Sequence, residues 1–280
     1  MSKSFYIHGN NLIKKISKTH HPKFLDEVYE RYLHWKESSE SLNSDSDTDL
    51  ERKVALLNEY KNYVDLLSEK GNLKLQDKVA SSIIEEFLFY VFKDMPQLKS
   101  VLEDGLIHAG QAHAYTDLSF VPKDFTDFQN RPGVYINKKN QDFAISKIVN
   151  CVFETNGVEE MAQIIVPAVA IECKTFIPST MLGQSSYEAH RLKQGNPYAL
   201  YIIVAEQNAL SEDVNLKNLD IDEIFILRKQ KRNSKKNKLE DKNPIDFFVV
   251  RDMYNFVKKH LEKPWFNVQK ATEKGRLIQT

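Results

Sequence analysis

Asp142, Glu172 and Lys174 are the residues whose types and spacing could support catalysis. Glu172 and Lys174 follow an apolar run, 164–171, that has the composition of a buried strand. Side chains alternate along a strand, so Glu172 and Lys174 share one face and Cys173 points to the other. Two charged groups at the rim of a buried strand need a partner or a metal ion. The pair is therefore a candidate site, although Glu-x-Lys also occurs on ordinary surface strands.

Asp142 opens another predicted strand, 143–153, and the Glu-Thr-Asn-Gly sequence at 154–157 predicts the turn that follows it. A hairpin with this turn would bring Asp142 level with Glu172 and Lys174. Two carboxylates provide the oxygen ligands that Mg²⁺ prefers. Such an ion polarises a phosphate and lowers the pKa of a bound water, and a neighbouring lysine stabilises the developing charge. The three residues thus predict metal-dependent phosphodiester hydrolysis, with Asp142 and Glu172 as metal ligands.

The elements that must position these residues are helices first and strands later. Apolar residues recur at helical spacing over 24–35, 54–67 and 76–93, whereas 100–140 has no clean period and suggests loops and short strands. After the predicted hairpin come a helix over 184–194 and strands over 198–205 and 221–227. A basic stretch, the apolar segment 247–250 and a last helix over 252–261 complete the chain. This order predicts an α/β fold with a mixed sheet.

Asp142, the Ile171-Glu172-Cys173-Lys174 segment and the helix and strand that follow resemble the PD-(D/E)XK nuclease superfamily. The segments 81–88, 140–145, 170–176 and 192–204 more narrowly resemble restriction endonucleases of the BbvCI kind, two-subunit enzymes that cut short asymmetric DNA sites. This resemblance implies a restriction-endonuclease-like αβββαβ core. We therefore expect an N-terminal helical region over 1–75 and a nuclease domain over 76–280, which includes a basic loop, 228–242, and a C-terminal helix.

The resemblance also implies a glutamate on the first core helix that faces the metal site. Glu85 and Glu86 are the candidates, and Glu86 is preferred; an ordinary solvated helix face is the alternative. Gln184 and Tyr187 lie near the start of the helix after the active-site strand, where polar residues of related nucleases touch the scissile phosphate. Those two residues could equally be polar surface residues of a helix start.

Seven basic residues and no acidic one lie within 228–238. Lys+Arg and Asp+Glu number 39 each in the whole chain, so a nucleic-acid surface must come from such local clustering. Lys231, Arg232, Lys235 and Lys236 are the predicted DNA contacts, since clustered positive charge attracts phosphates. Phosphate contacts do not read sequence, and a solvated loop remains the alternative.

Several classes of protein are excluded. With only two cysteines, the chain has neither a disulfide scaffold nor a cysteine-rich zinc site. The start has no secretory signal, and the longest apolar run is about half of what spans a bilayer. Glycine spacing typical of dinucleotide or ATP binding is absent. We therefore expect a soluble, cytoplasmic protein.

Three functions remain for this sequence. The first is a Mg²⁺-dependent Type II restriction endonuclease subunit that acts on double-stranded DNA, and the intact Asp142, Glu172 and Lys174 favour it. The second is a DNA-binding partner subunit that cuts nothing, and the third is a repair or phage nuclease of the same superfamily. The resemblance suggests a second, related subunit, although the chain could also pair with itself.

Overall fold

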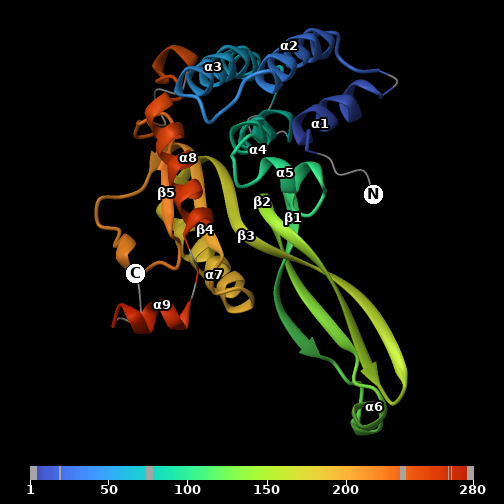
Figure 1. Cartoon of the computed structure of the whole chain (residues 1–280). Coiled ribbons are helices and arrows are strands. Elements are labelled where there is room, and N and C mark those ends of the chain that lie inside the picture. The colour runs from blue at the N-terminus through green and yellow to red at the C-terminus, as the bar shows by residue number, and fades with distance from the viewer. Residues whose placement is uncertain are drawn as a thin grey trace.

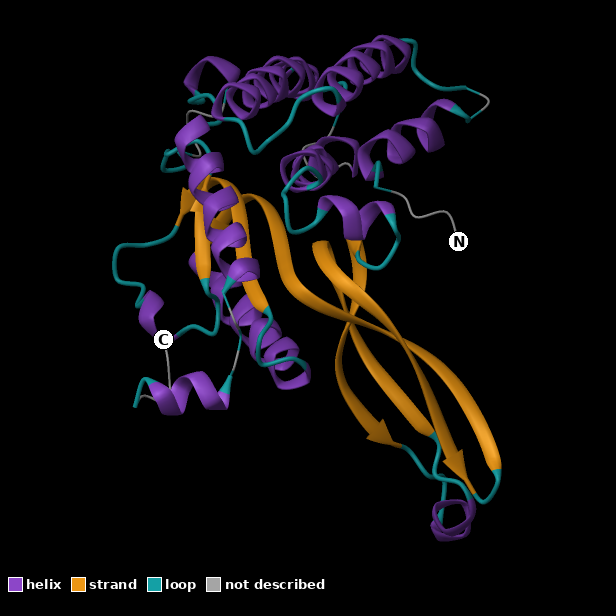
Figure 2. Ribbon diagram, viewed as in Figure 1, coloured by secondary structure: helices purple, strands orange, loops and turns teal. Residues whose placement is uncertain are grey.

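The computed structural model describes residues 5–18, 20–73, 78–233, 238–263, 265 and 267–275 (Figures 1 and 2). Its first part is helical, as the apolar spacing predicts, with α1 (Ile7–Ile16), α2 (Phe24–Glu40) and α3 (Asp47–Glu69). The observed helices are longer than the apolar stripes. For example, the Ser46 side chain accepts a hydrogen bond from the Asp49 backbone N–H and so begins α3 before its first apolar residue.

The central part of the chain has the predicted αβββαβ order. It consists of α4 (Lys78–Phe92), β1 (His108–Phe120), β2 (Val134–Thr155), β3 (Val158–Pro178), α7 (Ser179–Gly195) and β4 (Leu200–Ala209). Together with β5 (Glu223–Ile226), the strands form one sheet in the order β1-β2-β3-β4-β5. The β1–β2 and β2–β3 pairs are antiparallel, whereas β3–β4 and β4–β5 are parallel. The prediction of a mixed α/β sheet is therefore confirmed.

Two helical layers enclose the sheet around β3 and β4. One hydrophobic cluster joins the N-terminal helices, α4 and α8 (Phe247–Glu262) to one face; Phe92 of α4 lies between Phe143 of β2 and Tyr254 of α8. A second cluster lies between the opposite face and α7, and it includes Leu182, Ala189 and Tyr201. Because a hydrophobic cluster covers each face of the sheet, both faces of β4 are buried, which explains its nearly uninterrupted apolar sequence.

β1, β2 and β3 extend away from the helices as a long arm with α6 (Phe125–Asn130) at its far end (Figure 1). Both ends of β2 lie there, because the Asn156 side chain donates a hydrogen bond to the Asn130 carbonyl over 2.7 Å and Arg131 pairs with Glu160. β2 therefore bends back on itself, and the pairing with β1 shifts register between Gln141 and Ala144 at the bend. A register shift of this kind bends a strand.

β1 lies within the stretch 100–140, for which the sequence predicted loops and short strands; its length was not predicted, because its residues alternate only weakly. The segment 247–250 belongs to α8 and is not separate from it, since the Asp246 side chain caps the helix by accepting from the Val249 N–H. The remaining elements are short: α5 (Lys99–Glu103), the 3₁₀ turns Leu216–Asn218 and Leu239–Asp241, and α9 (Val268–Glu273). Among the described residues, each helix is too short or too polar to cross a membrane.

Candidate active site

The predicted hairpin forms and brings the first acidic residue to the second. Asn156 and Gly157 both adopt positive φ, 53° and 77°, as a two-residue type I′ turn requires. The turn pairs Thr155 with Val158, and a one-residue shift of register between Ile145 and Ser146 then pairs Phe143 with Ile171, so Asp142 lies level with Glu172. The Asp142 Oδ2 atom accepts a hydrogen bond of 2.8 Å from the backbone N–H of Cys173. Asp142 lies at the bend of β2, where a strand that continued straight could not present it in this way.

Glu172 is the most firmly held carboxylate of the site. Its Oε1 atom lies 2.6 Å from the Nζ atom of Lys174. Its Oε2 atom accepts hydrogen bonds from the Ser185 hydroxyl of α7 over 2.8 Å and from the buried Tyr201 hydroxyl of β4 over 3.2 Å. The strand–helix–strand unit thus fixes the carboxylate, as a preorganised site requires.

The pKa values of these groups reflect burial and their mutual charges. Burial raises the pKa of Asp142 above its ordinary value, and repulsion by Glu172 adds to this effect. Burial acts in the same direction on Glu172, but the hydrogen bond and charge of Lys174, aided by Ser185 and Tyr201, hold the pKa of Glu172 below its ordinary value. Burial would lower the pKa of Lys174, but Glu172 outweighs that effect and raises it. Lys174 is therefore a permanent cation at neutral pH.

Glu85 faces the site, and Glu86 does not. Burial and the charge of Asp142 together raise the pKa of Glu85 to about 8, although Lys78 and Lys174 act in the opposite direction. The preference for Glu86 is thus corrected. Consecutive residues of a helix point about 100° apart, so only one of the two can face Asp142. The spacing along α4 did not show which one.

Glu86 instead forms part of a buried network behind α4. Its side chain is fully buried. It accepts one hydrogen bond of 3.0 Å from the backbone N–H of Gly9 in α1 and another of 2.6 Å from the Tyr90 hydroxyl. A buried carboxylate needs such partners. Glu86 therefore joins α1 to α4 and contributes to the structure around the site.

Helix α7 presents the two predicted phosphate contacts on its exposed surface. Tyr187 is 62% exposed, and the exposed Gln184 side chain donates to Glu188 over 3.0 Å. Lys139 of β2 also approaches Glu188, with 2.5 Å between Nζ and Oε1. Neither Gln184 nor Tyr187 contacts Asp142 or Glu172 directly, but Ser185 between them does reach Glu172.

The predicted basic stretch divides into different environments. Arg228 is 1% exposed and pairs with Asp65 and Glu206, so it cannot reach DNA. Lys231 is exposed and lies 3.4 Å from Glu212. The Arg232 guanidinium lies 3.5 Å from the ring centroid of Phe176. Lys235 and Lys236 lie outside the described residues.

Arg232 therefore lies close to the active-site strand. Phe176 is two residues beyond Lys174 on β3, and alternation puts both side chains on the same face. A cation stacked on an aromatic ring is held in place. Of the described basic residues predicted to contact DNA, Arg232 is the one that the structure ties to the strand of Glu172 and Lys174.

The side chains around Asp142 suit a hard divalent cation. Asp142, Glu172 and Glu85 offer only carboxylate oxygens, which favour ions such as Mg²⁺ or Mn²⁺ over zinc. Burial is the main cause of the raised pKa values of Asp142 and Glu85, and repulsion between neighbouring carboxylates adds to it, so a bound cation would stabilise their charged forms. Among the described residues, no three His, Cys, Asp or Glu side chains form a ready-made metal site. The case for a divalent cation therefore rests on the carboxylates of Asp142 and Glu172, which lie level with each other on β2 and β3, with Glu85 nearby.

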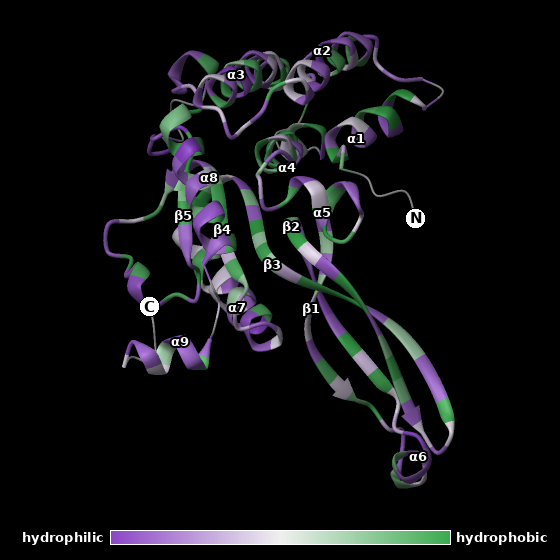
Figure 3. Ribbon diagram, viewed as in Figure 1, coloured by the Kyte–Doolittle hydropathy of each residue, from purple (hydrophilic) through white to green (hydrophobic). Residues whose placement is uncertain are grey.

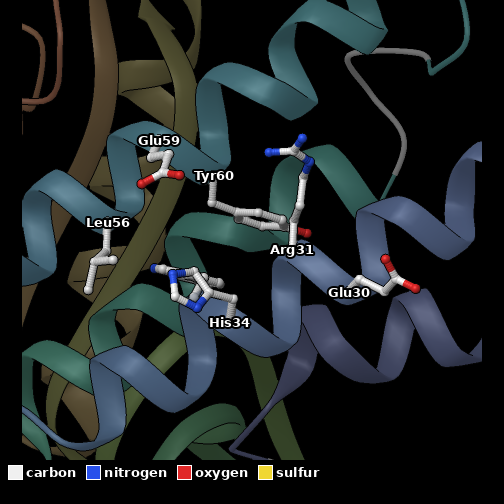
Figure 4. Close-up of a pocket in the computed structure, with 7 residues that line it drawn as sticks. Glu30, Arg31, His34, Leu56, Glu59 and Tyr60 are labelled. Carbon is white, nitrogen blue, oxygen red and sulfur yellow. The ribbon is translucent and has the colours of Figure 1, made fainter.

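A polar pocket with a volume of about 340 Å³ adjoins the site, and Glu85, Gln111 and Asp142 contribute to its walls. A different pocket, of about 250 Å³, lies between α2 and α3 (Figure 4). His34, Leu56 and Tyr60 line that second pocket, and none of the predicted site residues does. Of these two pockets, the one beside Asp142 is therefore the candidate substrate pocket.

Sequence reasoning missed Ser185, Tyr201 and Lys139. Tyr201 carried one available signal, because a hydroxyl within an otherwise apolar buried strand needs a hydrogen-bond partner. Ser185 and Lys139 carried none, since their roles depend on how α7 lies over β3 and on the bend of β2.

Comparison with known proteins identifies the family. A model of the Bpu10I restriction endonuclease family matches residues 75–277. A solved structure described as the native BbvCI A2B2 tetramer at low resolution is similar to this chain with a TM-score of 0.71 and 23% sequence identity. The similarity covers 91% of this chain and 96% of that chain. No curated protein matches the sequence. Since the family model spans most of the chain, the protein belongs to the Bpu10I restriction endonuclease family and is a nuclease that hydrolyses DNA.

Proposed function

We propose that the chain is the Mg²⁺-dependent catalytic subunit of a Type II restriction endonuclease, with Asp142, Glu172 and Lys174 as its active site. The observation that carries this proposal is the convergence of the three residues at the β2 bend and the end of β3. A subunit that only binds DNA has no need to keep two carboxylates and a lysine in this arrangement. Family membership favours restriction over the repair or phage nuclease that the sequence left open.

The residues divide the work of phosphodiester hydrolysis. Restriction endonucleases generally use a divalent metal ion, and Asp142 and Glu172 are the residues that would hold it. When bound, the ion supplies a Lewis acid and an acidified water. The Lys174 ammonium, fixed by Glu172 at 2.6 Å, is placed to stabilise negative charge on the phosphate and to orient the attacking water. Glu85 takes the place first given to Glu86 as the additional acid.

The metal proposal predicts complete loss of cleavage in excess EDTA. Adding back Mg²⁺ or Mn²⁺ should restore plasmid cutting, whereas Ca²⁺ should support DNA binding with little cutting. Glu172→Ala should abolish rescue by Mg²⁺ while leaving the circular dichroism spectrum unchanged. Gel analysis of plasmid DNA measures each of these results. Full activity without any divalent ion would refute the metal assignment.

DNA contact is proposed for two surfaces beside the active site. Gln184 and Tyr187 lie on the exposed face of α7, whose Ser185 reaches Glu172. Arg232 lies against Phe176 near the end of β3, and Lys231 forms a backbone bridge with Asn208 of β4. We assign residues 76–280 to the nuclease domain, which agrees with the start of the family match at residue 75. We assign residues 1–75 to a helical region, whose described residues share a hydrophobic core with the nuclease domain.

We further propose that the arm carries the contact with a second endonuclease subunit. Its far end, residues 120–135 and 148–163, exposes large apolar side chains: Phe120, Val121, Phe125, Phe128, Tyr135, Ile148, Val149, Val152, Val158 and Met161. Hydrophobic segments continue along the arm (Figure 3). The same two segments hold five acidic and two basic residues, which disfavours DNA there. Exposed apolar area of this extent is typical of protein interfaces.

The arm proposal predicts a change in assembly. Replacing Phe125 and Met161, which are 71% and 77% exposed, with Ser should shift the protein to a smaller species. Light scattering after size exclusion measures this for the chain alone and for the chain co-expressed with a related subunit. Phe248→Ser is a matched control, since Phe248 is 70% exposed on α8. An unchanged mass in the arm variant would contradict the proposal. The species formed by wild type distinguishes self-pairing from a heteromer.

The second candidate function is a binding subunit that cuts nothing. It would show as specific DNA binding with no cleavage in Mg²⁺ under any subunit combination. In either case we place the protein in the cytoplasm, where a host defence acts on incoming DNA.

A further inference from the structure

Helix α1 lies against α4 through buried polar contacts and cannot move independently of the active site. Glu86 accepts from the Gly9 N–H, and the His8 ring contacts the Tyr60 hydroxyl over 2.6 Å. The Asn11 amide donates to the Ser82 hydroxyl over 3.2 Å. At Gly9, a Cβ atom would lie 2.1 Å from the Tyr32 hydroxyl, so only glycine allows this approach. Helix α1 is therefore a fixed wall beside α4.

The polar pocket beside Asp142 is closed on one side by this wall. Asn11 and Lys14 of α1 line it together with Lys78 of α4, while Glu85 and Asp142 line the side toward the sheet. Lys78 and Glu85 are seven residues apart on α4, which puts them on one helix face two turns apart. The pocket thus holds acidic groups at the catalytic end and basic groups at the α1 end.

This separation of charge matches what a DNA strand needs next to a nuclease site. Asp142 interacts electrostatically with Glu85 on one side and Glu172 on the other, so the catalytic end of the pocket is acidic and repels phosphate. Lys14 and Lys78 are exposed, and no ion pair joins either of them to a carboxylate within the described residues. A lysine ammonium on a flexible stem binds phosphate as a point charge. Amide side chains such as Asn11 add hydrogen bonds to the same kind of oxygen.

We propose that Lys14 and Lys78 bind a backbone phosphate of the DNA strand that neighbours the scissile phosphate. This inference rests on the proposed active site and deepens it, because it extends the DNA-binding surface to α1, beyond the segment 228–238 and the α7 residues Gln184 and Tyr187 where the sequence placed it. Glu86 then acts as a positioning residue, since it holds the helix that carries Lys14. The N-terminal helical region contributes directly to substrate binding.

Binding of labelled duplex DNA in EDTA tests the proposal without cleavage. Lys14→Ala and Lys78→Ala should each weaken affinity several-fold at physiological salt. Each should also reduce the slope of log K against log salt by about 0.9, the value for one lost phosphate contact on duplex DNA. Lys18→Ala is the matched control, since Lys18 is exposed just beyond α1 and does not line the pocket. Its affinity and slope should equal those of wild type.

Lys14→Arg distinguishes a loss of charge from a loss of local structure. This variant keeps the positive charge, so the slope of log K against log salt should stay at the wild-type value. If the Ala variants show unchanged affinity and slope, or if Lys14→Arg loses affinity as fully as Lys14→Ala, the proposal is overturned. Failure of the proposed active site would appear elsewhere, as normal plasmid cutting by Glu172→Ala. The binding measurements decide the role of Lys14 and Lys78 independently of that outcome.

Discussion

Lys174→Ala is expected to lower the rate of DNA cleavage by a factor on the order of 10² or more, the effect of removing one preorganised charged donor. The Lys174 ammonium lies 2.6 Å from Glu172. In the proposed active site, its charge would stabilise the negative charge that builds on the scissile phosphate. Binding of DNA should be nearly unchanged, because an interaction that matters most in the transition state affects the rate more than the affinity. Single-turnover cleavage of plasmid DNA and binding in Ca²⁺ measure the two quantities separately.

The control for this variant is Lys138→Ala, which removes an exposed lysine from the arm side of β2. It should cut at the normal rate. If the chain works with a second catalytic subunit, the Lys174 variant with a normal partner should nick one strand, and nicked plasmid should accumulate in place of linear product. Linear product at the normal rate from Lys174→Ala would refute this active site.

Arg228→Ala is expected to lower the free energy of unfolding by about 3–5 kcal/mol, the cost of removing one partner from a buried ion pair. Arg228 is fully buried, with Nη2 at 3.3 Å from Asp65 and Nε at 3.0 Å from Glu206. Lys61 reaches the same two acids at 3.0 Å, so the group joins α3 to β4. Without Arg228, Lys61 and Lys242 still pair with the two acids, but the Glu206 Oε2 atom and the Asn243 carbonyl lose their hydrogen bonds from the guanidinium. Denaturant titration measures the change.

Lys229→Ala is the matched control for this prediction. Lys229 neighbours Arg228 in sequence, but it is exposed and pairs with Asp246 at the surface. Exposed pairs contribute about 0–1 kcal/mol, so its unfolding curve should nearly overlay that of wild type. Equal stability of the two variants would show that the buried network does not contribute as its geometry implies.

The sequence alone predicted the α/β fold class and the hairpin, which the structure shows, and it predicted that Asp142, Glu172 and Lys174 lie together, whose catalytic role stays a proposal. These depend on local patterns: the apolar run before Glu172, strand alternation and the Asn-Gly turn all act over a few residues. The turn predicts that Asp142 and Glu172 lie near the same end of the hairpin, but their alignment also needs the register shift between Ile145 and Ser146, which the sequence did not show. The family resemblance added the αβββαβ order, and the observed elements follow it.

Other features depended on contacts between segments far apart in the chain, and only the tertiary structure decided them. Glu85 rather than Glu86 faces Asp142 because α1 packs against the side of α4 that carries Glu86 and buries it. Arg228 belongs to the core although Lys229 and Lys231 of the same basic stretch are exposed, since Asp65 of α3 and Glu206 of β4 meet it there. The bend of β2 and the placement of Lys14 beside the site arise in the same way. Periodicity shows that a helix or strand forms, but the packing of distant elements decides which side chains meet.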